Sequence, residues 1–284
     1  IRYKRMQGYA VTDRPGYDMH GLPIETRVEE ELGFENKQDI EAFGVESFIE
    51  ECQSFAEDSL DSLQSDFQSF GVWMDWENPY KTVDPTYMES AWWGFKQAHD
   101  RGLVEQGKRS ITQCPRCETA IANNEVEYED VEDPSIYVKF SLADREGSLV
   151  VWTTTPWTIP ANTFVAVDPD GDYVAVRADG DLLYVAEPKV ESVLREGRYD
   201  DYEIEAELTG EELLGWSYEH PLADRVPAHP DGDGALEVHS AEYVDTEGDG
   251  TGLVHSAPGH GEEDFQRGRE LGLDAFCPVA EDGT

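Results

Sequence analysis

The clearest candidates for chemistry in this sequence are Thr153, Thr154 and Thr155, which follow a short apolar run and precede Trp157 and Thr158. Clustered hydroxyls can orient a water molecule, bind a ribose hydroxyl or hold a carbonyl group, but they cannot act as a general base at neutral pH unaided. Neither a Gly-x-Ser-x-Gly elbow nor a hydrolase-like Ser/His/Asp spacing accompanies them, which disfavours a covalent threonine nucleophile. A buried strand ending in a proline turn is the plainer interpretation, because threonine and valine favour strands.

A second cluster lies about 100 residues later, in a glycine-rich loop at residues 250–265. His255, His260 and Asp264 could bind a metal ion, which would make the chain a metal-dependent hydrolase. Alternatively, Asp264 could pair with a ligand ammonium while His255 shapes a pocket. Asp264 could also simply be an acid favoured at a helix start, with His255 ending a strand. The residues alone leave these alternatives open.

Cys114 and Cys117 have the spacing of half a four-cysteine zinc site, in which two thiolates sit on a tight knuckle. A redox pair is possible but is more typical of a helix start in a thioredoxin-like fold. Cys52 falls on the apolar stripe of a predicted helix, and Cys277 stands alone before a proline. We therefore expect zinc in the intact protein, with two ligands outside this chain and weak or no occupancy here.

Asp18 and His20 lie on a loop bracketed by glycines, after a predicted strand at residues 9–12 and before a predicted helix at residues 24–32. Loops at the carboxyl ends of strands carry ligand-binding groups in open α/β sheets. The two side chains are therefore candidates for substrate contact. A capping aspartate and a structural histidine are the alternative.

The hydrophobic pattern predicts three segments. Apolar residues spaced by three and four predict amphipathic helices at residues 45–70 and 85–101, with their apolar faces directed inward. From residue 135 the chain reads as short strands separated by turns at barrel-like spacing. The expected fold class is α/β. A helix-rich segment at 1–102 leads through a connecting segment with the cysteine pair at 103–134 to a β-barrel-like domain at 135–284.

The composition is strongly acidic, with 62 acidic residues, 21 basic residues and a formal net charge of -41. The 7 Trp, 13 Tyr and 11 Phe argue against a disordered acidic segment, so we expect a folded protein with an acidic, halophile-like shell. In molar salt the Debye length falls to about 3 Å, so this charge does not exclude a tRNA partner. Four cysteines without a disulfide pattern predict a reducing cytoplasm. No apolar run is long enough to span a membrane, and the chain reads as an excised piece of a longer protein.

Together these motifs resemble those of the isoleucyl-tRNA synthetases, class I enzymes with a Rossmann catalytic core. The resemblance implies that residues 1–102 are a partial Rossmann-type core, 103–134 a zinc-knuckle segment and 135–284 an editing domain that is incomplete at its C-terminus. Residues 15–25 resemble their Pro-Gly-Trp-Asp-x-His-Gly-Leu-Pro-Ile-Glu segment, with Tyr17 in place of Trp and Met19 in place of a frequent Cys. Residues 152–158 and 252–265 resemble the two signatures of the inserted editing domain, and residues 114–117 the first half of its zinc knuckle. The valyl and leucyl relatives share the threonine-rich signature but differ in the segment at 15–25.

The resemblance implies that the editing domain hydrolyses valyl-tRNA(Ile), which the intact enzyme makes in error while ligating isoleucine to tRNA(Ile) with ATP and Mg²⁺. His-Ile-Gly-His and Lys-Met-Ser-Lys-Ser signatures are both absent from the sequence, so we expect no amino-acid activation by this chain. A non-catalytic tRNA-binding piece is the remaining alternative. We expect a monomer whose partners are tRNA(Ile), isoleucine and valine.

The resemblance also implies residue roles. Asp264 would pair with the α-ammonium of the misattached amino acid, and Asp18 would bind the amino group of isoleucine in the synthetic site, on the loop that carries His20. His255 and Trp157 would limit the size of the side chain in the editing pocket. The remaining pocket lining and its support would come from the threonines: Thr153, Thr154, Thr155 and Thr158.

Overall fold

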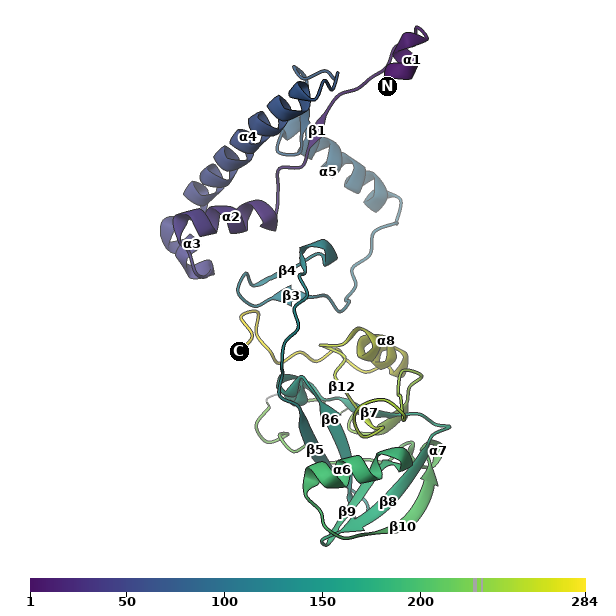
Figure 1. The fold of residues 1–284 in the computed structure, drawn as a ribbon. Helices are drawn as coiled ribbons and strands as arrows, with labels where there is room; N and C mark the ends of the chain where they lie inside the picture. Colours follow the sequence, from purple (N-terminus) through teal and green to yellow (C-terminus); the bar gives the residue numbers. More distant parts are fainter. Residues whose placement is uncertain (227–228, 231) are drawn as a thin grey trace. The chain divides into compact units, whose positions relative to one another are not determined.

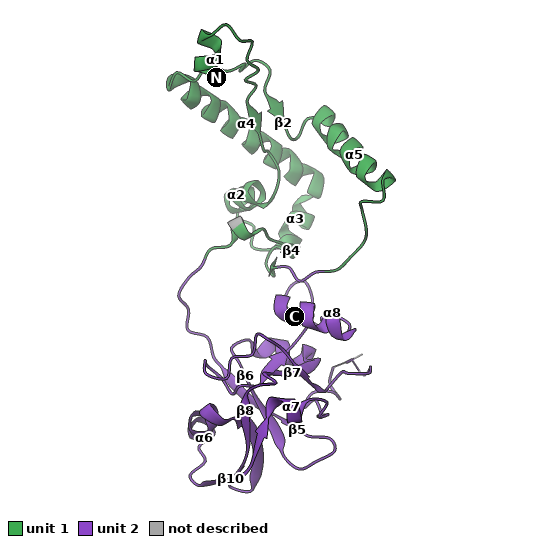
Figure 2. Ribbon diagram, turned by 90° about the vertical axis from the view of Figure 1, so that its right-hand side faces the viewer, with its two compact units in different colours: residues 1–108, 112–127 green, residues 109–111, 128–284 purple. Residues whose placement is uncertain are grey.

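The computed structural model describes residues 1–226, 229–230 and 232–284, which fall into two units (Figures 1 and 2). The first unit holds residues 1–108 and 112–127, and the second holds residues 109–111 and 128–284. The sequence-based division, with limits after residues 102 and 134, stays a prediction.

The first unit is mainly helical. Helix α2 ends at Gly33, whose positive φ of 74° suits glycine, and Asn36 then caps α3 through a reciprocal pair of hydrogen bonds with Asp39. Helix α4 contacts α2 and α3 and buries Phe48 and Leu60. The helices of this unit are α1 (Arg2–Met6), α2 (Leu22–Leu32), α3 (Lys37–Phe43), α4 (Val45–Ser69) and α5 (Pro85–Asp100).

Two short pairs of strands complete the first unit. Strand β1 (Gly16–Tyr17) pairs in parallel with β2 (Tyr80–Lys81), and β3 (Gln113–Cys114) pairs antiparallel with β4 (Thr119–Ala120), which the short 3-10 helix η1 (Asn123–Glu125) follows. The strand predicted at residues 9–12 is wrong: that segment is irregular, and pairing begins only at Gly16. Alternation alone cannot supply the partner that a strand needs.

The larger sheet of the second unit has the strand order β10-β8-β9-β6-β5. All neighbours in it are antiparallel except β6 and β9. Figure 1 shows α6 (Val190–Gly197) lying across β8 and β9, where it buries Val190, Val193 and Leu194. The strands are β5 (Ile136–Ser141), β6 (Ser148–Thr153), β8 (Asp172–Ala178), β9 (Asp181–Ala186) and β10 (Tyr202–Thr209).

A smaller sheet has β7 (Phe164–Val167) at its centre, parallel to β11 (Val238–Ser240) and antiparallel to β12 (Val254–Ser256). The two sheets share one apolar core that includes Leu149 and Val165. The predicted barrel is wrong: among the described residues the edge strands β5 and β10 do not pair with each other, so the sheet stays open. Closure depends on the registers of strands far apart in sequence, which turn spacing does not encode.

The remaining elements of the second unit are the helices α7 (Gly210–Leu213) and α8 (Glu262–Leu271) and the 3-10 segments η2 (Pro156–Ala161) and η3 (Glu187–Lys189). Across the described ranges, no helix combines the length and the apolar character that a membrane span requires.

Candidate functional site

The threonine-rich segment folds back on itself where β6 ends. The hydroxyl of Thr153 accepts the Thr155 N–H at 3.0 Å and lies 3.1 Å from the Thr155 hydroxyl. Pro156 then opens η2, and the Thr158 hydroxyl donates to the Thr155 carbonyl at 2.8 Å. Short side chains of this kind often hydrogen-bond to nearby backbone where regular structure ends. The predicted strand is confirmed up to Thr153, and a 3-10 helix follows it in place of a simple turn.

His255 connects this turn to the smaller sheet. It lies on β12 opposite Val165 of β7, and its ring is buried. Its Nε2 lies 2.9 Å from the Thr158 hydroxyl, and its Nδ1 lies 2.9 Å from the side-chain nitrogen of Asn162. Asn162 is fully buried, and its amide oxygen accepts the Tyr218 hydroxyl at 2.5 Å.

These contacts determine the protonation of the His255 ring. An amide nitrogen can only donate, so Nδ1 must accept and the proton must reside on Nε2. The Thr158 hydroxyl then accepts a hydrogen bond from Nε2–H and donates one to the Thr155 carbonyl. Burial, with smaller contributions from His220 and His260, lowers the pKa of His255 to about 4. His255 is therefore neutral at pH 7, and both its nitrogens are engaged.

Asp264 lies in the first turn of α8. One carboxylate oxygen accepts the Ala257 N–H at 3.0 Å, and the other accepts the Tyr243 hydroxyl at 3.1 Å. Burial raises the pKa of this carboxyl group, although these hydrogen bonds and one from Ser256 act in the opposite direction. None of the ion pairs among the described residues includes Asp264. The site thus holds a half-buried carboxylate without a cationic partner from the described chain.

Three further motif residues lie in the same unit. The Trp157 side chain is 57% exposed, and its ring meets His260 edge-to-face with centroids 5.4 Å apart. His260 Nε2 is buried and has no hydrogen-bond partner among the described residues. Thr154 is exposed, and no described group hydrogen-bonds to its hydroxyl. These groups retain binding capacity that the fold does not use.

A metal centre on His255, His260 and Asp264 receives no support from the geometry. The described residues contain no group of three or more His, Cys, Asp or Glu side chains arranged to hold a metal ion. Both nitrogens of His255 are already bonded to protein, and a metal would have to break one of those bonds.

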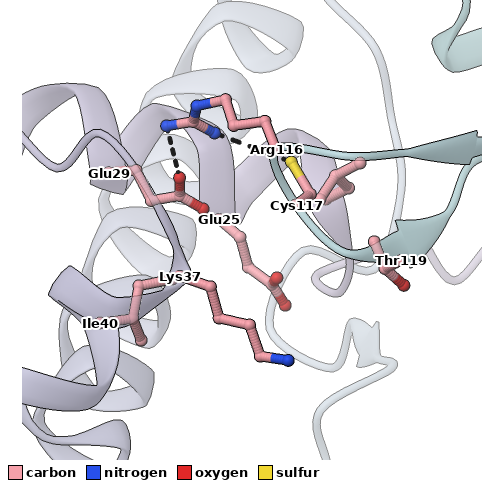
Figure 3. A pocket seen from close by; sticks show the side chains of 8 residues that line it. Glu25, Glu29, Lys37, Ile40, Arg116, Cys117 and Thr119 are labelled. Atoms are coloured by element: carbon pink, nitrogen blue, oxygen red, sulfur yellow. Dashed lines mark hydrogen bonds and ion pairs between the residues drawn. The ribbon is translucent and has the colours of Figure 1, made fainter. Parts of the chain in front are cut away.

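Cys114 and Cys117 lie in the β3–β4 hairpin of the first unit. Cys117 lines a cavity of about 130 Å³ (Figure 3). Arg116 reaches from the hairpin turn to the Glu29 carboxylate at 2.8 Å and lies 3.7 Å from the Cys117 sulfur. Burial raises the pKa of Cys114, but hydrogen bonds from Cys117 and the Arg116 backbone outweigh it, so the pKa is lowered overall. Cys52 is half-buried in α4 and Cys277 is exposed.

The two hairpin thiols do not make a complete zinc site. Structural zinc takes four ligands, and no third ligand joins Cys114 and Cys117 within the described ranges. The half-site with further ligands outside the chain stays a prediction, and no chemical step is assigned to zinc here.

Asp18 and His20 are exposed on the loop between β1 and α2, and their contact with substrate stays a prediction. The Thr82 hydroxyl lies 3.4 Å from an Asp18 carboxylate oxygen and accepts the Met19 N–H at 2.9 Å. Met19 is buried and packs with α4. The loop is therefore held by its backbone and by Met19, while Asp18 and His20 remain accessible.

The sequence-family model of the class I tRNA synthetases for isoleucine, leucine, methionine and valine matches residues 1–245. The chain belongs to the class I tRNA synthetases. It is 73% identical to an isoleucine–tRNA ligase of Halobacterium salinarum and 71% identical to one of Haloarcula marismortui. Each match covers 100% of this chain but only 27% of the relative, so the chain spans about a quarter of the length of these synthetases. The predicted resemblance to isoleucyl-tRNA synthetases is confirmed.

A solved structure of the Plasmodium knowlesi cytosolic leucyl-tRNA synthetase editing domain also resembles this synthetase segment. The sequence identity is 14% and the TM-score is 0.40, over 49% of this chain and 62% of that one.

Sequence reasoning missed Asn162, Tyr218 and Tyr243, which hold His255 and Asp264 in place. Asn162 stands between Ala161 and Thr163, close to the threonine run, and this proximity was the usable signal. Tyr218 and Tyr243 lie far from the motifs they support, and only the fold brings them close.

Proposed function

We propose that the second unit is an editing site that hydrolyses the ester of a misattached amino acid on tRNA, with valyl-tRNA(Ile) as substrate. The intact synthetase would ligate isoleucine to tRNA(Ile) with ATP and Mg²⁺. One observation carries this proposal: the half-buried Asp264 carboxylate has no cationic partner from the described residues. An aminoacyl ester presents the α-ammonium that this carboxylate lacks.

The need for a second site follows from the physics of small apolar side chains. Isoleucine and valine differ by one methylene group, which contributes about 1–3 kcal/mol to binding in an apolar pocket. A single pocket therefore prefers isoleucine over valine by only about 10²-fold, and this pair is the standard example of that limit. A second site that admits valine and excludes isoleucine removes the remaining errors.

We assign distinct tasks to the motif residues. Asp264 would hold the ammonium, and the exposed Thr154 and Trp157 would contact the amino acid or the terminal adenosine. Thr153, Thr155 and Thr158 form a turn that would position the ester, and His255 would be a fixed wall of the editing pocket.

The attacking water has no general base among these groups. The threonine hydroxyls are too weakly basic, and the Nδ1 lone pair of His255 is committed to Asn162. The substrate itself carries a ribose hydroxyl next to the ester. This hydroxyl is no stronger a base, so we assign to it the orientation of the attacking water and the relay of the water's proton to the ribose oxygen that leaves as the ester bond breaks.

Deacylation of valyl-tRNA(Ile) by the 284-residue chain in multimolar KCl tests this function. Asp264→Ala should lower kcat/KM roughly 10- to 100-fold, because a charge-assisted contact is worth about 1.5–3 kcal/mol. Glu263→Ala is the matched control, since Glu263 is an exposed acid in the same helical turn and should retain full activity. Equal rates for wild type and Asp264→Ala would refute the role of Asp264. Binding of valyl-tRNA(Ile) without turnover by the wild type would favour a non-catalytic tRNA-binding piece.

A further inference from the structure

Tyr218 stands at the far end of the hydrogen-bond chain that fixes His255. Its ring is buried and stacks on Phe140 with centroids 5.1 Å apart. Its backbone forms a bridge with Leu142 and donates to the Leu236 carbonyl at 3.0 Å. The backbone and the ring are thus both held, and the hydroxyl has one fixed position in the core.

The Tyr218 hydroxyl and the Phe164 carbonyl hydrogen-bond to opposite ends of the Asn162 side-chain amide and so fix its orientation. The hydroxyl donates to the amide oxygen at 2.5 Å, and the amide nitrogen donates to the Phe164 carbonyl at 2.9 Å. If the amide were reversed, its oxygen would face the Phe164 carbonyl and the Tyr218 proton would lose its acceptor. A buried donor without an acceptor is costly, so only one amide orientation is stable.

That orientation presents an N–H to His255 Nδ1 and so requires the Nε2–H tautomer. The tautomer matters to the threonine turn because the Thr158 proton is already used on the Thr155 carbonyl. Towards His255, therefore, Thr158 must accept. A ring protonated on Nδ1 would turn a lone pair towards Thr158, and Thr158 would have to give up its bond to Thr155.

We propose that Tyr218 is a positioning residue of the deacylation site, acting through Asn162 to fix the His255 tautomer and thereby the turn formed by Thr155 and Thr158. The tautomer part of this inference stands on the hydrogen-bond geometry alone. The activity part rests on the proposed editing function.

The test uses Tyr218→Phe, which keeps the stacked ring and removes only the hydroxyl. Tyr173→Phe is the matched control, because Tyr173 is equally buried and its hydroxyl donates to the Gly252 carbonyl at 2.9 Å without contacting Asn162. Nitrogen-15 NMR of histidine-labelled chain reports the tautomer directly, and the His255 signals are assigned by their loss in His255→Gln. Deacylation of valyl-tRNA(Ile) is measured on the same samples.

The wild type should show only the Nε2–H tautomer of His255. In Tyr218→Phe the population of the Nδ1–H tautomer should rise about tenfold, as expected for the loss of one hydrogen bond. The kcat for deacylation should fall by about the same factor. Tyr173→Phe should leave both unchanged.

Several outcomes overturn the inference. A tautomer mixture in the wild type refutes it without any substitution, so it can be tested even if Tyr218→Phe does not fold. An unchanged His255 spectrum in folded Tyr218→Phe also refutes it, and a changed tautomer with unchanged kcat refutes the positioning role. If the wild type deacylates nothing, the editing function fails, while the NMR result still decides the tautomer.

Discussion

The neutral His255 makes a definite prediction about acid stability. The folded unit holds this ring with a pKa of about 4, whereas an unfolded histidine titrates near pH 6.5. Between these values the unfolded chain binds a proton that the folded chain does not. The stabilising contribution is therefore complete above about pH 6.5 and declines as the pH falls towards 4.

The size of the effect follows from the shift. Each pKa unit corresponds to 1.36 kcal/mol, so about 2.5 units amount to about 3 kcal/mol of unfolding free energy lost between pH 6.5 and 4. Burial also lowers the pKa of His220 and His260, which adds losses of the same sign. Asp264 acts in the opposite direction, because its raised pKa makes the folded carboxyl group take up a proton before the unfolded one does.

Urea unfolding in multimolar KCl, repeated between pH 7 and pH 4, measures this dependence. His255→Gln keeps a polar, hydrogen-bonding side chain that does not titrate, so its stability should fall by about 3 kcal/mol less than that of the wild type over this range. His99→Gln is the control, because the His99 side chain is 68% exposed and its loss should leave the dependence unchanged. Parallel curves for wild type and His255→Gln would refute the assignment of the acid sensitivity to the buried ring.

Two further substitutions test the packing. Arg116→Met should destabilise the first unit by about 1–2 kcal/mol in urea unfolding, because it leaves the Glu29 carboxylate, only 6% exposed, without its cation. Arg27→Met removes a cation from an exposed ion pair on α2, the helix that carries Glu29, and should cost under about 0.5 kcal/mol. Equal losses of stability in the two variants would contradict a stabilising role for the Arg116–Glu29 ion pair. Gly259→Ala should lower the melting temperature of the second unit, because the added Cβ would lie 2.2 Å from a backbone oxygen. In Gly94→Ala the added Cβ would have no atom within 4 Å, so this control should be neutral or stabilising by about 1 kcal/mol. A Gly259→Ala chain as stable as the wild type would show that the loop has room to move.

Local patterns predicted the elements of the second unit well. Short strands separated by turns were expected from residue 135 onward, and the structure forms them, beginning with β5 at residues 136–141. What the sequence could not provide was the pairing between distant strands. The open sheet order, with β6 parallel to β9 in the middle, depends on contacts that no local spacing records.

The helices of the first unit show the same limit in another form. Spacing predicted α5 correctly, but its apolar face was expected to point inward, and Trp92 and Phe95 are instead 71% and 55% exposed. Periodicity states which face of a helix is apolar and carries no information about what covers that face.

The motif residues of the second unit differ in how much of their hydrogen-bonding capacity the fold uses. Thr153, Thr158 and His255 are bonded to one another or to nearby backbone, which makes them parts of the frame. Asp264 still carries a charge that no described residue neutralises, and Thr154 carries a free hydroxyl.

This difference has a consequence for Asp264. Burial disfavours its ionised form, so an ammonium brought against it must favour that form and recover part of the electrostatic cost. Ligand binding and ionisation of Asp264 are therefore coupled by linkage, each strengthening the other. A neutral ligand of the same shape would gain nothing from this coupling, so under the proposed function the charge on Asp264 would select for an amino group.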